Sequence, residues 1–336
     1  MRTTAGERRA RAKRNLIFLG LFLILAVGAY FAYQYYEQHT AVQERGVATE
    51  GFGERRRVEY RGRKYAEKTA LTTILVMGVD REDSDARVGA RSGGQADFLL
   101  LLAVDHQHKR IYQLQIDRDT LTPVAVMGIL GNKVGTRTTQ ICLAHGFGMT
   151  EEECCLNTVE AASNLLEGLE IDYYVSISMS AMAKVNNLLG GVTVTMDKDY
   201  TDIDPVMTEG ATIRLTDEQA VGFLRGRMNV GEGTNADRMS RHRLFLHAAA
   251  DRITEMTKAS AGFIADFYTG LQDSMSTNMT QSALVAEVNE AIGYEVVPIE
   301  TLPGEHMIGS DGFMEFHVEN GAPAAWVMSA CYDPVD

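Results

Sequence analysis

Apolar and polar positions follow two different periods in the part of the chain beyond about residue 70. Short apolar or β-branched runs predict β-strands, and one of these runs is unbroken and should be buried on both faces. The predicted strands are Thr72–Val79, Phe98–Val104, Arg110–Ile116, Tyr173–Ile177 and Val192–Met196.

Helical spacing of apolar residues appears between these strands. It predicts helices over Glu151–Leu166, Ser180–Leu189, Thr216–Arg225, Asn235–Lys258 and Ser282–Ile292. Thr216 and Gln219 have the spacing of a capping box, which marks the start of the third helix. The alternation of strands and helices predicts an α/β fold with a central mixed β-sheet flanked by helices.

The first part of the chain has a different pattern. Residues 15–36 contain no charged side chain and follow a strongly basic segment, so they predict a transmembrane helix with its N-terminus in the cytoplasm. A cleaved signal peptide ending near Ala26-Val27-Gly28 is the alternative. In the first interpretation, 1–14 is a cytoplasmic tail, 37–70 a juxtamembrane linker and 71–336 an extracytoplasmic domain of a single-pass protein of the cell membrane.

Charge is distributed unevenly over the 336 residues, whose formal net charge is −13. Beyond residue 68 there are 18 Lys and Arg against 38 Asp and Glu. Because proteins that coat nucleic acid neutralise phosphates with a basic face, this acidic body argues against nucleic acid as a partner.

The cysteines lie in the part expected to be exported, where disulfides are permitted. They are Cys142, Cys154, Cys155 and Cys331. Their spacing leaves open a bond from Cys142 to one of the neighbouring pair, or four buried free thiols.

Carboxylates stand at the ends of two predicted strands. Asp80 follows the strand that ends at Val79, and Asp97 precedes the strand that begins at Phe98. If the strands are neighbours, the two carboxylates could share a hard divalent ion such as Mg²⁺, which takes one or two carboxylates together with phosphate oxygens and water. A turn or cap role for each Asp is the alternative.

Basic residues gather at two places that could bind a phosphate. Arg118 directly follows a predicted strand, between two Asp residues, and a guanidinium grips phosphate through paired N–H donors. Arg225, Arg227, Arg238, Arg241 and His242 lie close together in the C-terminal half, the last three on one predicted helix face. Solvated ion pairs would account for either cluster alone.

Taken in order, several segments resemble the LytR-CpsA-Psr family over nearly the whole exported region. They are Ile74–Arg81, the stretch from Arg91-Ser92 to Asp97, Ile116–Thr120, Ile171–Val175, Leu189–Val192, and Arg225-Gly226-Arg227 with Arg238 and Arg241. The resemblance implies an α/β domain with a hydrophobic groove for a polyprenyl chain, behind a membrane anchor.

The resemblance also implies a site. Asp80 and Asp97 would hold Mg²⁺ or Mn²⁺, and a set of basic residues would bind the pyrophosphate. That set is Arg81, Arg118, Arg225, Arg227, Arg238, Arg241 and His242. Asp80, Arg118 and Asp237 are the candidate catalytic residues, with an Asp accepting the proton of the attacking hydroxyl.

The implied reaction transfers a phosphate-linked glycan, of the teichoic acid or capsular kind, from a polyprenyl pyrophosphate carrier to a peptidoglycan hydroxyl. A hydrolase of the same carrier, or a non-catalytic wall-polymer binding or regulatory protein, are the alternatives. The chain departs from the family pattern at three positions and in one spacing: Asp117 stands where Pro is usual, Asn235 where Asp is usual and His242 where Gln is usual, and four residues separate Ser92 from Asp97. Asp237 is then the candidate to take over from the missing Asp.

Overall fold

The computed structural model describes residues 56–81, 94–128, 132–226 and 233–335. The chain divides into two compact units, Met1–Glu54 and Arg55–Asp336, and all described residues belong to the second. Within the described ranges, no helix combines the length and the apolar character needed to cross a membrane. The helix predicted over 15–36, the pair Arg91-Ser92 and Arg227 lie outside the described residues.

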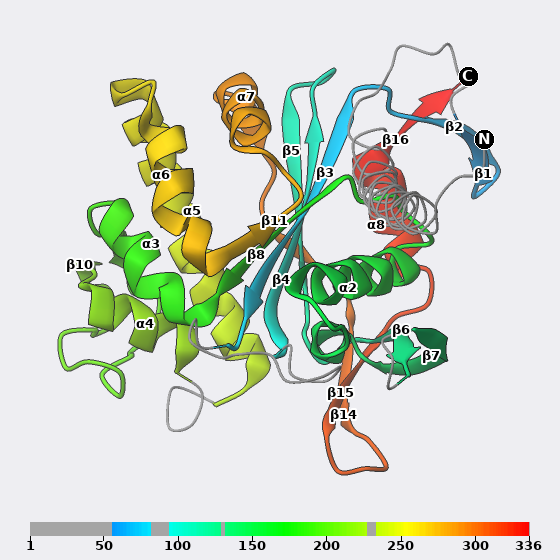
Figure 1. Ribbon diagram of the computed structural model, residues 1–336, viewed down its shortest axis with the longest axis horizontal. Helices are drawn as coiled ribbons and strands as arrows, with labels where there is room; N and C mark the ends of the chain where they lie inside the picture. The colour runs from blue at the N-terminus through cyan, green and yellow to red at the C-terminus, as the bar shows by residue number, and fades with distance from the viewer. Residues whose placement is uncertain (1–55, 82–93, 129–131, 227–232, 336) are drawn as a thin grey trace, which may run out of the picture. The chain divides into compact units, whose positions relative to one another are not determined.

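A central mixed sheet organises the fold, as the sequence predicted (Figure 1). Its strands lie in the order β11 (Met275–Thr277), β8 (Tyr173–Ser178), β3 (Leu71–Val79), β4 (Ala96–Asp105), β5 (Arg110–Ile116) and β12 (Glu295–Val296), and β13 (Glu300–Thr301) also pairs with β5. β8 runs parallel to β3, and β12 and β13 run parallel to β5, whereas the other neighbours are antiparallel.

Helices cover both faces of this sheet (Figure 1). One face carries α2 (Glu151–Leu165) and α8 (Ala322–Cys331), and the other carries α3 (Met182–Leu188), α4 (Asp217–Arg225), α5 (Asn235–Ala259), α6 (Phe263–Leu271) and α7 (Gln281–Ala291). Leu75, Met77 and Leu101 are fully buried in the core on the α2 side. Because helices cover both faces of β3 and β4, both strands are nearly continuous apolar runs.

The five predicted helices are confirmed, with small differences at their ends. Thr216 and Gln219 form the predicted capping box, in which the Thr216 hydroxyl accepts the Gln219 N–H at 3.2 Å and the Gln219 side chain accepts the Thr216 N–H at 3.0 Å. Helix α6 was not predicted. The strand predicted over 192–196 forms β9 (Thr193–Thr195), which pairs with β10 (Thr212–Arg214) outside the central sheet.

Residues 57–67, expected within the linker, are strands of the compact unit. They form β1 (Arg57–Tyr60) and β2 (Arg63–Glu67), and β2 pairs with β16 (Tyr332–Val335) at the C-terminus. Two hairpins in segments with little regular signal were also not predicted: β6 (Leu121–Met127) with β7 (Lys133–Gln140), and β14 (Gly304–Ile308) with β15 (Met314–Val318). All four cysteines are buried and none is in a disulfide in the part of the chain that the structure describes, which agrees with the second of the two alternatives.

Candidate functional site

Asp80 and Asp97 come together at one end of the sheet. Val79 pairs with Ala96 and Gly78 pairs with Phe98, so Asp97 is an extra residue in β4, a β-bulge. The Asp80 N–H donates to the carbonyl oxygen of Gln95 at 2.9 Å. The bulge therefore places Asp97 at the strand end where Asp80 follows the neighbouring strand.

Two arginines hold the carboxylate of Asp97. Arg118, in the loop after β5, donates to one oxygen, and Arg238, on α5, donates to the other at 3.1 Å. Arg118 is further held by Asp119, at 3.2 Å from its Nε, and by the side-chain oxygen of Gln95. Both guanidiniums are nearly buried, and Asp97 and Asp119 supply their counter-charges.

Arg225 reaches the same region from the end of α4. Its Nη2 lies 2.9 Å from Asp80 Oδ1, and both side chains are about half exposed. An exposed pair of this kind separates easily, because Coulomb attraction in water is weak. Arg227, two residues further on, lies outside the described residues.

Arg241 is the most deeply buried arginine of the set, with 1% of its surface exposed. One terminal nitrogen donates to the carbonyl oxygen of Gly226, while Nε and Nη1 have no hydrogen-bond partner among the described residues. Burial lowers the pKa of Arg241, and the nearby Asp237 partly opposes that shift. A buried guanidinium with unpaired donors is suited to an anionic ligand.

Asp237 and His242 are placed differently from these arginines. Asp237 lies in the first turn of α5, where its N–H donates to Thr234 and its carboxylate meets Lys198 at 3.3 Å. His242 is buried, its Nε2 lies 2.9 Å from the Leu224 carbonyl oxygen, and burial lowers its pKa to about 4. A neutral imidazole has no charge to offer a pyrophosphate.

The His242 ring packs edge-on against Phe98, with ring centroids 5.3 Å apart, and both residues line the cavity described below. His242 is thus a wall residue of the apolar cavity, close enough to Asp97 for that charge to oppose part of the fall in its pKa.

Arg81 points toward α2, where it pairs with Glu151. Its carbonyl oxygen accepts a hydrogen bond from Ser178 Oγ at 2.6 Å. Glu151 also lies near His145 and Cys155, in a group with metal-ligand chemistry. Because Arg81 pairs with Glu151, its guanidinium already places a positive charge beside this group.

An apolar cavity of about 590 Å³ opens between the sheet and the helices of its second face. Its walls include Ile74, Val76, Gly78, Phe98, Leu102, Val175 and Ile177 from the sheet, and Met182, Val185, Phe245, Ala249, Ile264, Phe267, Leu284 and Val288 from the helices. A Cβ on Gly78 would lie 2.8 Å from Met179 Sδ, so only glycine leaves this space open. Phe98 directly follows Asp97, so the cavity begins beside the arginines.

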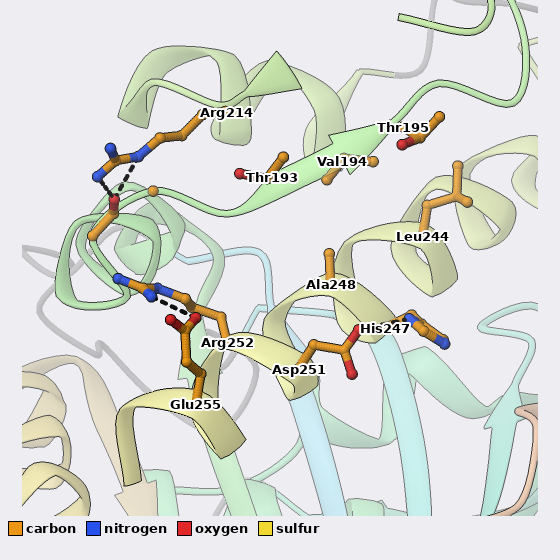
Figure 2. Close-up of a pocket in the computed structure, with 12 residues that line it drawn as sticks. Thr193, Val194, Thr195, Arg214, Leu244, His247, Ala248, Asp251, Arg252 and Glu255 are labelled. Carbon is orange, nitrogen blue, oxygen red and sulfur yellow. Dashed lines mark hydrogen bonds and ion pairs between the residues drawn. The ribbon is translucent and has the colours of Figure 1, made fainter. Parts of the chain in front are cut away.

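A second pocket, also of about 590 Å³, lies between β9, β10 and α5 (Figure 2). Figure 2 shows Arg214 bonded to the Gly190 carbonyl oxygen and Arg252 bonded to Glu255. None of the residues predicted for the site lines this polar pocket. Among the predicted residues that the structure describes, His242 lines the apolar cavity, and the carboxylates and arginines adjoin it through Asp97, the residue before the lining residue Phe98.

The chain is similar to several known proteins. A polyisoprenyl-teichoic acid–peptidoglycan teichoic acid transferase, TagU, from Bacillus cereus is 25% identical over 256 residues, which cover 76% of each chain. The crystal structure of protein gbs0355 from Streptococcus agalactiae matches with a TM-score of 0.62 at 20% identity, over 76% of this chain and 85% of that one. B. subtilis TagV matches with a TM-score of 0.61 at 23% identity, over 78% of this chain and 96% of that one.

The likeness to the solved structures concerns the fold, since identity is low in both. The family model is more direct, because it matches residues 31–324 and so includes the sheet, the apolar cavity and every arginine of the site. The chain belongs to the LytR_cpsA_psr family.

Proposed function

We propose that this protein transfers a phosphate-linked glycan from a polyprenyl pyrophosphate carrier to a sugar hydroxyl of peptidoglycan. One observation carries the proposal: the end of a long apolar cavity lies beside a cluster of arginines, joined through the adjacent residues Asp97 and Phe98. An apolar tail and a pyrophosphate head on one molecule would match both parts. The relatives are named as transferases, which supports the same function.

The chemistry follows from the charges. The acceptor oxygen forms a bond to the glycan-linked phosphorus, the bond from that phosphorus to the bridging oxygen breaks, and polyprenyl phosphate leaves. Arg118, Arg225, Arg238 and Arg241 would bind the phosphate oxygens, where charge spreads in the transition state. The hydroxyl proton passes to a carboxylate, for which the half-exposed Asp80 is the most accessible.

Asp80 and Asp97 fit a hard divalent cation such as Mg²⁺, because both are oxygen donors at one strand end, with arginines available for the phosphates. As they stand, both carboxylates are paired with arginines, which a bound pyrophosphate would draw away. When bound, Mg²⁺ would neutralise charge on the phosphate oxygens. The metal ion and the guanidinium groups would then both bind the anionic pyrophosphate.

For location, we propose that residues 15–36 anchor the chain in the cell membrane and that the unit from Arg55 works on the outer side. The basic segment before residue 15 supports this orientation, because Lys and Arg next to a membrane span stay on the cytoplasmic side. A lipid-linked substrate is then within reach of a tethered enzyme.

The test uses the full-length chain in detergent with a polyprenyl pyrophosphate-linked oligosaccharide, Mg²⁺ and peptidoglycan oligomers. Asp80→Ala and Arg118→Ala should each reduce the phosphodiester-linked product about a hundredfold or more, because each removes a group that would bind the reacting phosphates. Arg110→Ala is the matched control: this residue pairs with Glu295 at the other end of β5, and the variant should retain activity.

The outcomes separate the candidate functions. Phosphodiester product that is lost in both site variants supports the transferase. Phosphorylated sugar released equally well without acceptor would instead identify a hydrolase. Tight carrier binding without turnover would identify a binding protein and contradict the proposal.

A further inference from the structure

The carboxylate of Asp117 is buried next to the arginines of the site, and both of its oxygens have hydrogen-bond partners. Its Oδ1 accepts the N–H of Asp119 at 2.8 Å and the side-chain amide of Asn235 at 2.9 Å. Its Oδ2 lies 2.9 Å from His306 Nε2. Three separate segments, the loop after β5, the first turn of α5 and the β14–β15 hairpin, therefore meet at one side chain.

Asn235 connects Asp117 to Arg238. Its amide nitrogen donates to Asp117, and its amide oxygen accepts a hydrogen bond from Arg238 Nη2 at 2.8 Å. Only a side chain with both a donor and an acceptor can make these two bonds. The other terminal nitrogen of Arg238 holds Asp97, so one continuous chain of contacts runs from Asp117 to Asp97.

The same carboxylate shapes the turn that carries Arg118. Besides the side-chain bond to Asp119, the carbonyl oxygen of Asp117 accepts the N–H of Thr120 at 3.1 Å. This closes a turn in which Arg118 is a central residue. Both arginines that grip Asp97 are thus fixed relative to a single group.

The hairpin is bound to this turn at two points. His306 meets Asp117, and the Phe316 N–H donates to the Asp119 carbonyl oxygen at 2.8 Å. The rings of His306 and Phe316 lie 4.7 Å apart, so they brace one another. Figure 1 shows the hairpin extending away from the sheet beyond this contact.

We propose that Asp117, acting through Asn235 and His306, is a positioning residue that holds Arg118 and Arg238 at the spacing required to bind the pyrophosphate. The proposal rests on the function proposed above, in which those arginines bind that group. Binding and catalysis by fixed guanidiniums depend on their placement, and a displacement of about 1 Å can cost on the order of a hundredfold in rate.

Asn235→Asp gives the sharpest test, because it replaces the donor that faces Asp117 with a second carboxylate. The change adds a negative charge to the first turn of α5, which favours the helix itself. We expect the affinity of the full-length chain for inorganic pyrophosphate, measured by calorimetry, to fall about tenfold or more, as loss of one buried hydrogen bond would produce. The loss in transfer should appear in kcat/KM, with a higher KM, because the ground-state binding of the pyrophosphate is weakened.

Asn187→Asp is the matched control. It also places a new carboxylate beside an existing one, since Asn187 donates to Asp217 at 3.2 Å, but it lies on α3 at the surface. Both pyrophosphate affinity and turnover should stay unchanged. In an Asp117→Asn background, Asn235→Asp should lower the pyrophosphate affinity by a much smaller factor than in the unmodified chain, because the repelling charge of Asp117 is gone.

An equal loss in both backgrounds, or unchanged affinity in Asn235→Asp, would overturn the proposal. The hairpin arm is tested by His306→Ala, which should weaken pyrophosphate binding, and by His306→Gln, which retains a donor and should restore it. If Asn235→Asp fails to fold, the two His306 variants test the proposal in its place. If the unmodified chain binds pyrophosphate but yields no transfer product, the proposed function fails, while these affinity comparisons still judge the role of Asp117.

Discussion

At the scale of single residues, Asp97 is the counter-charge for two nearly buried arginines. Asp97→Ala would remove the negative charge that Arg118 and Arg238 share. We expect the free energy of unfolding to fall by about 3 kcal/mol, the range for breaking a buried ion pair by removing one partner. Added pyrophosphate should restore part of the loss, and the melting temperature with and without this anion is the measurement.

Asp273→Ala, at an exposed position, serves as control and should show neither effect. If pyrophosphate raised the melting temperature of Asp97→Ala no more than that of the unmodified chain, the arginines would not be the anion site.

His242 makes stability depend on pH. Burial lowers its pKa from 6.5 to about 4, so the folded protein keeps it neutral while the unfolded chain takes up a proton below 6.5. Stability is therefore complete above pH 6.5 and is lost as pH falls toward 4, by about 3 kcal/mol. His242→Phe should flatten this part of the pH profile in chemical denaturation, whereas His247→Phe, at an exposed site, should not. A retained slope in His242→Phe would contradict the assignment.

At the scale of elements, Lys68 ties the N-terminal strands to the central sheet. It follows β2 and makes a buried ion pair at 2.8 Å with Asp105, the last residue of β4. Burial opposes ionisation of Asp105, but bonds from Lys68 and His108 outweigh it and lower its pKa. The pair therefore stabilises the fold above the unfolded pKa of Asp, and this contribution disappears as pH falls through the lower folded pKa.

Lys68→Met should cost about 3 to 5 kcal/mol in urea denaturation, because it leaves Asp105 buried without its cation. Lys64→Met, at an exposed position of β2, should cost little. A small loss in Lys68→Met would show that β2 is held by its strand pairing alone.

The sheet and the helices were accessible to sequence analysis because their periodicities are strong and the strands are buried on both faces. Proximity of Asp80 and Asp97 also followed from strand ends, although the bulge at Asp97 did not. The helical pattern could not separate Arg241 from the adjacent His242, since the contacts that distinguish them come from α4 and β4. His306 gave no signal, because it meets Asp117 across 189 positions of sequence.

At the scale of the whole described unit, α5 joins the two halves of the site. Arg238 and Arg241 are near its start, and Ala249 lines the apolar cavity about three turns further on. Ala249→Phe should narrow the cavity without touching the arginines. We expect KM for a long-chain carrier to rise while KM for a short-chain analogue stays nearly constant, as product assays on both carriers would measure.

Ala286→Phe, on the exposed side of α7, is the control for added bulk on a helix. Equal changes in KM for the two carriers would mean that the polyprenyl chain does not occupy the cavity.

Metal dependence tests whether the carboxylates at the strand ends and the arginines act on the same pyrophosphate. If Mg²⁺ shares the pyrophosphate with the guanidiniums, chelation by EDTA should abolish transfer, and Mg²⁺ or Mn²⁺ should restore it. Asp80 and Asp97 are now neutralised by arginines, so metal and pyrophosphate should each improve binding of the other. Calorimetry of pyrophosphate binding with and without Mg²⁺ measures this coupling. Asp80→Asn, which keeps the shape but removes the charge, should lose the coupling while retaining metal-independent pyrophosphate binding through Arg118 and Arg238; an undiminished coupling would place the cation elsewhere.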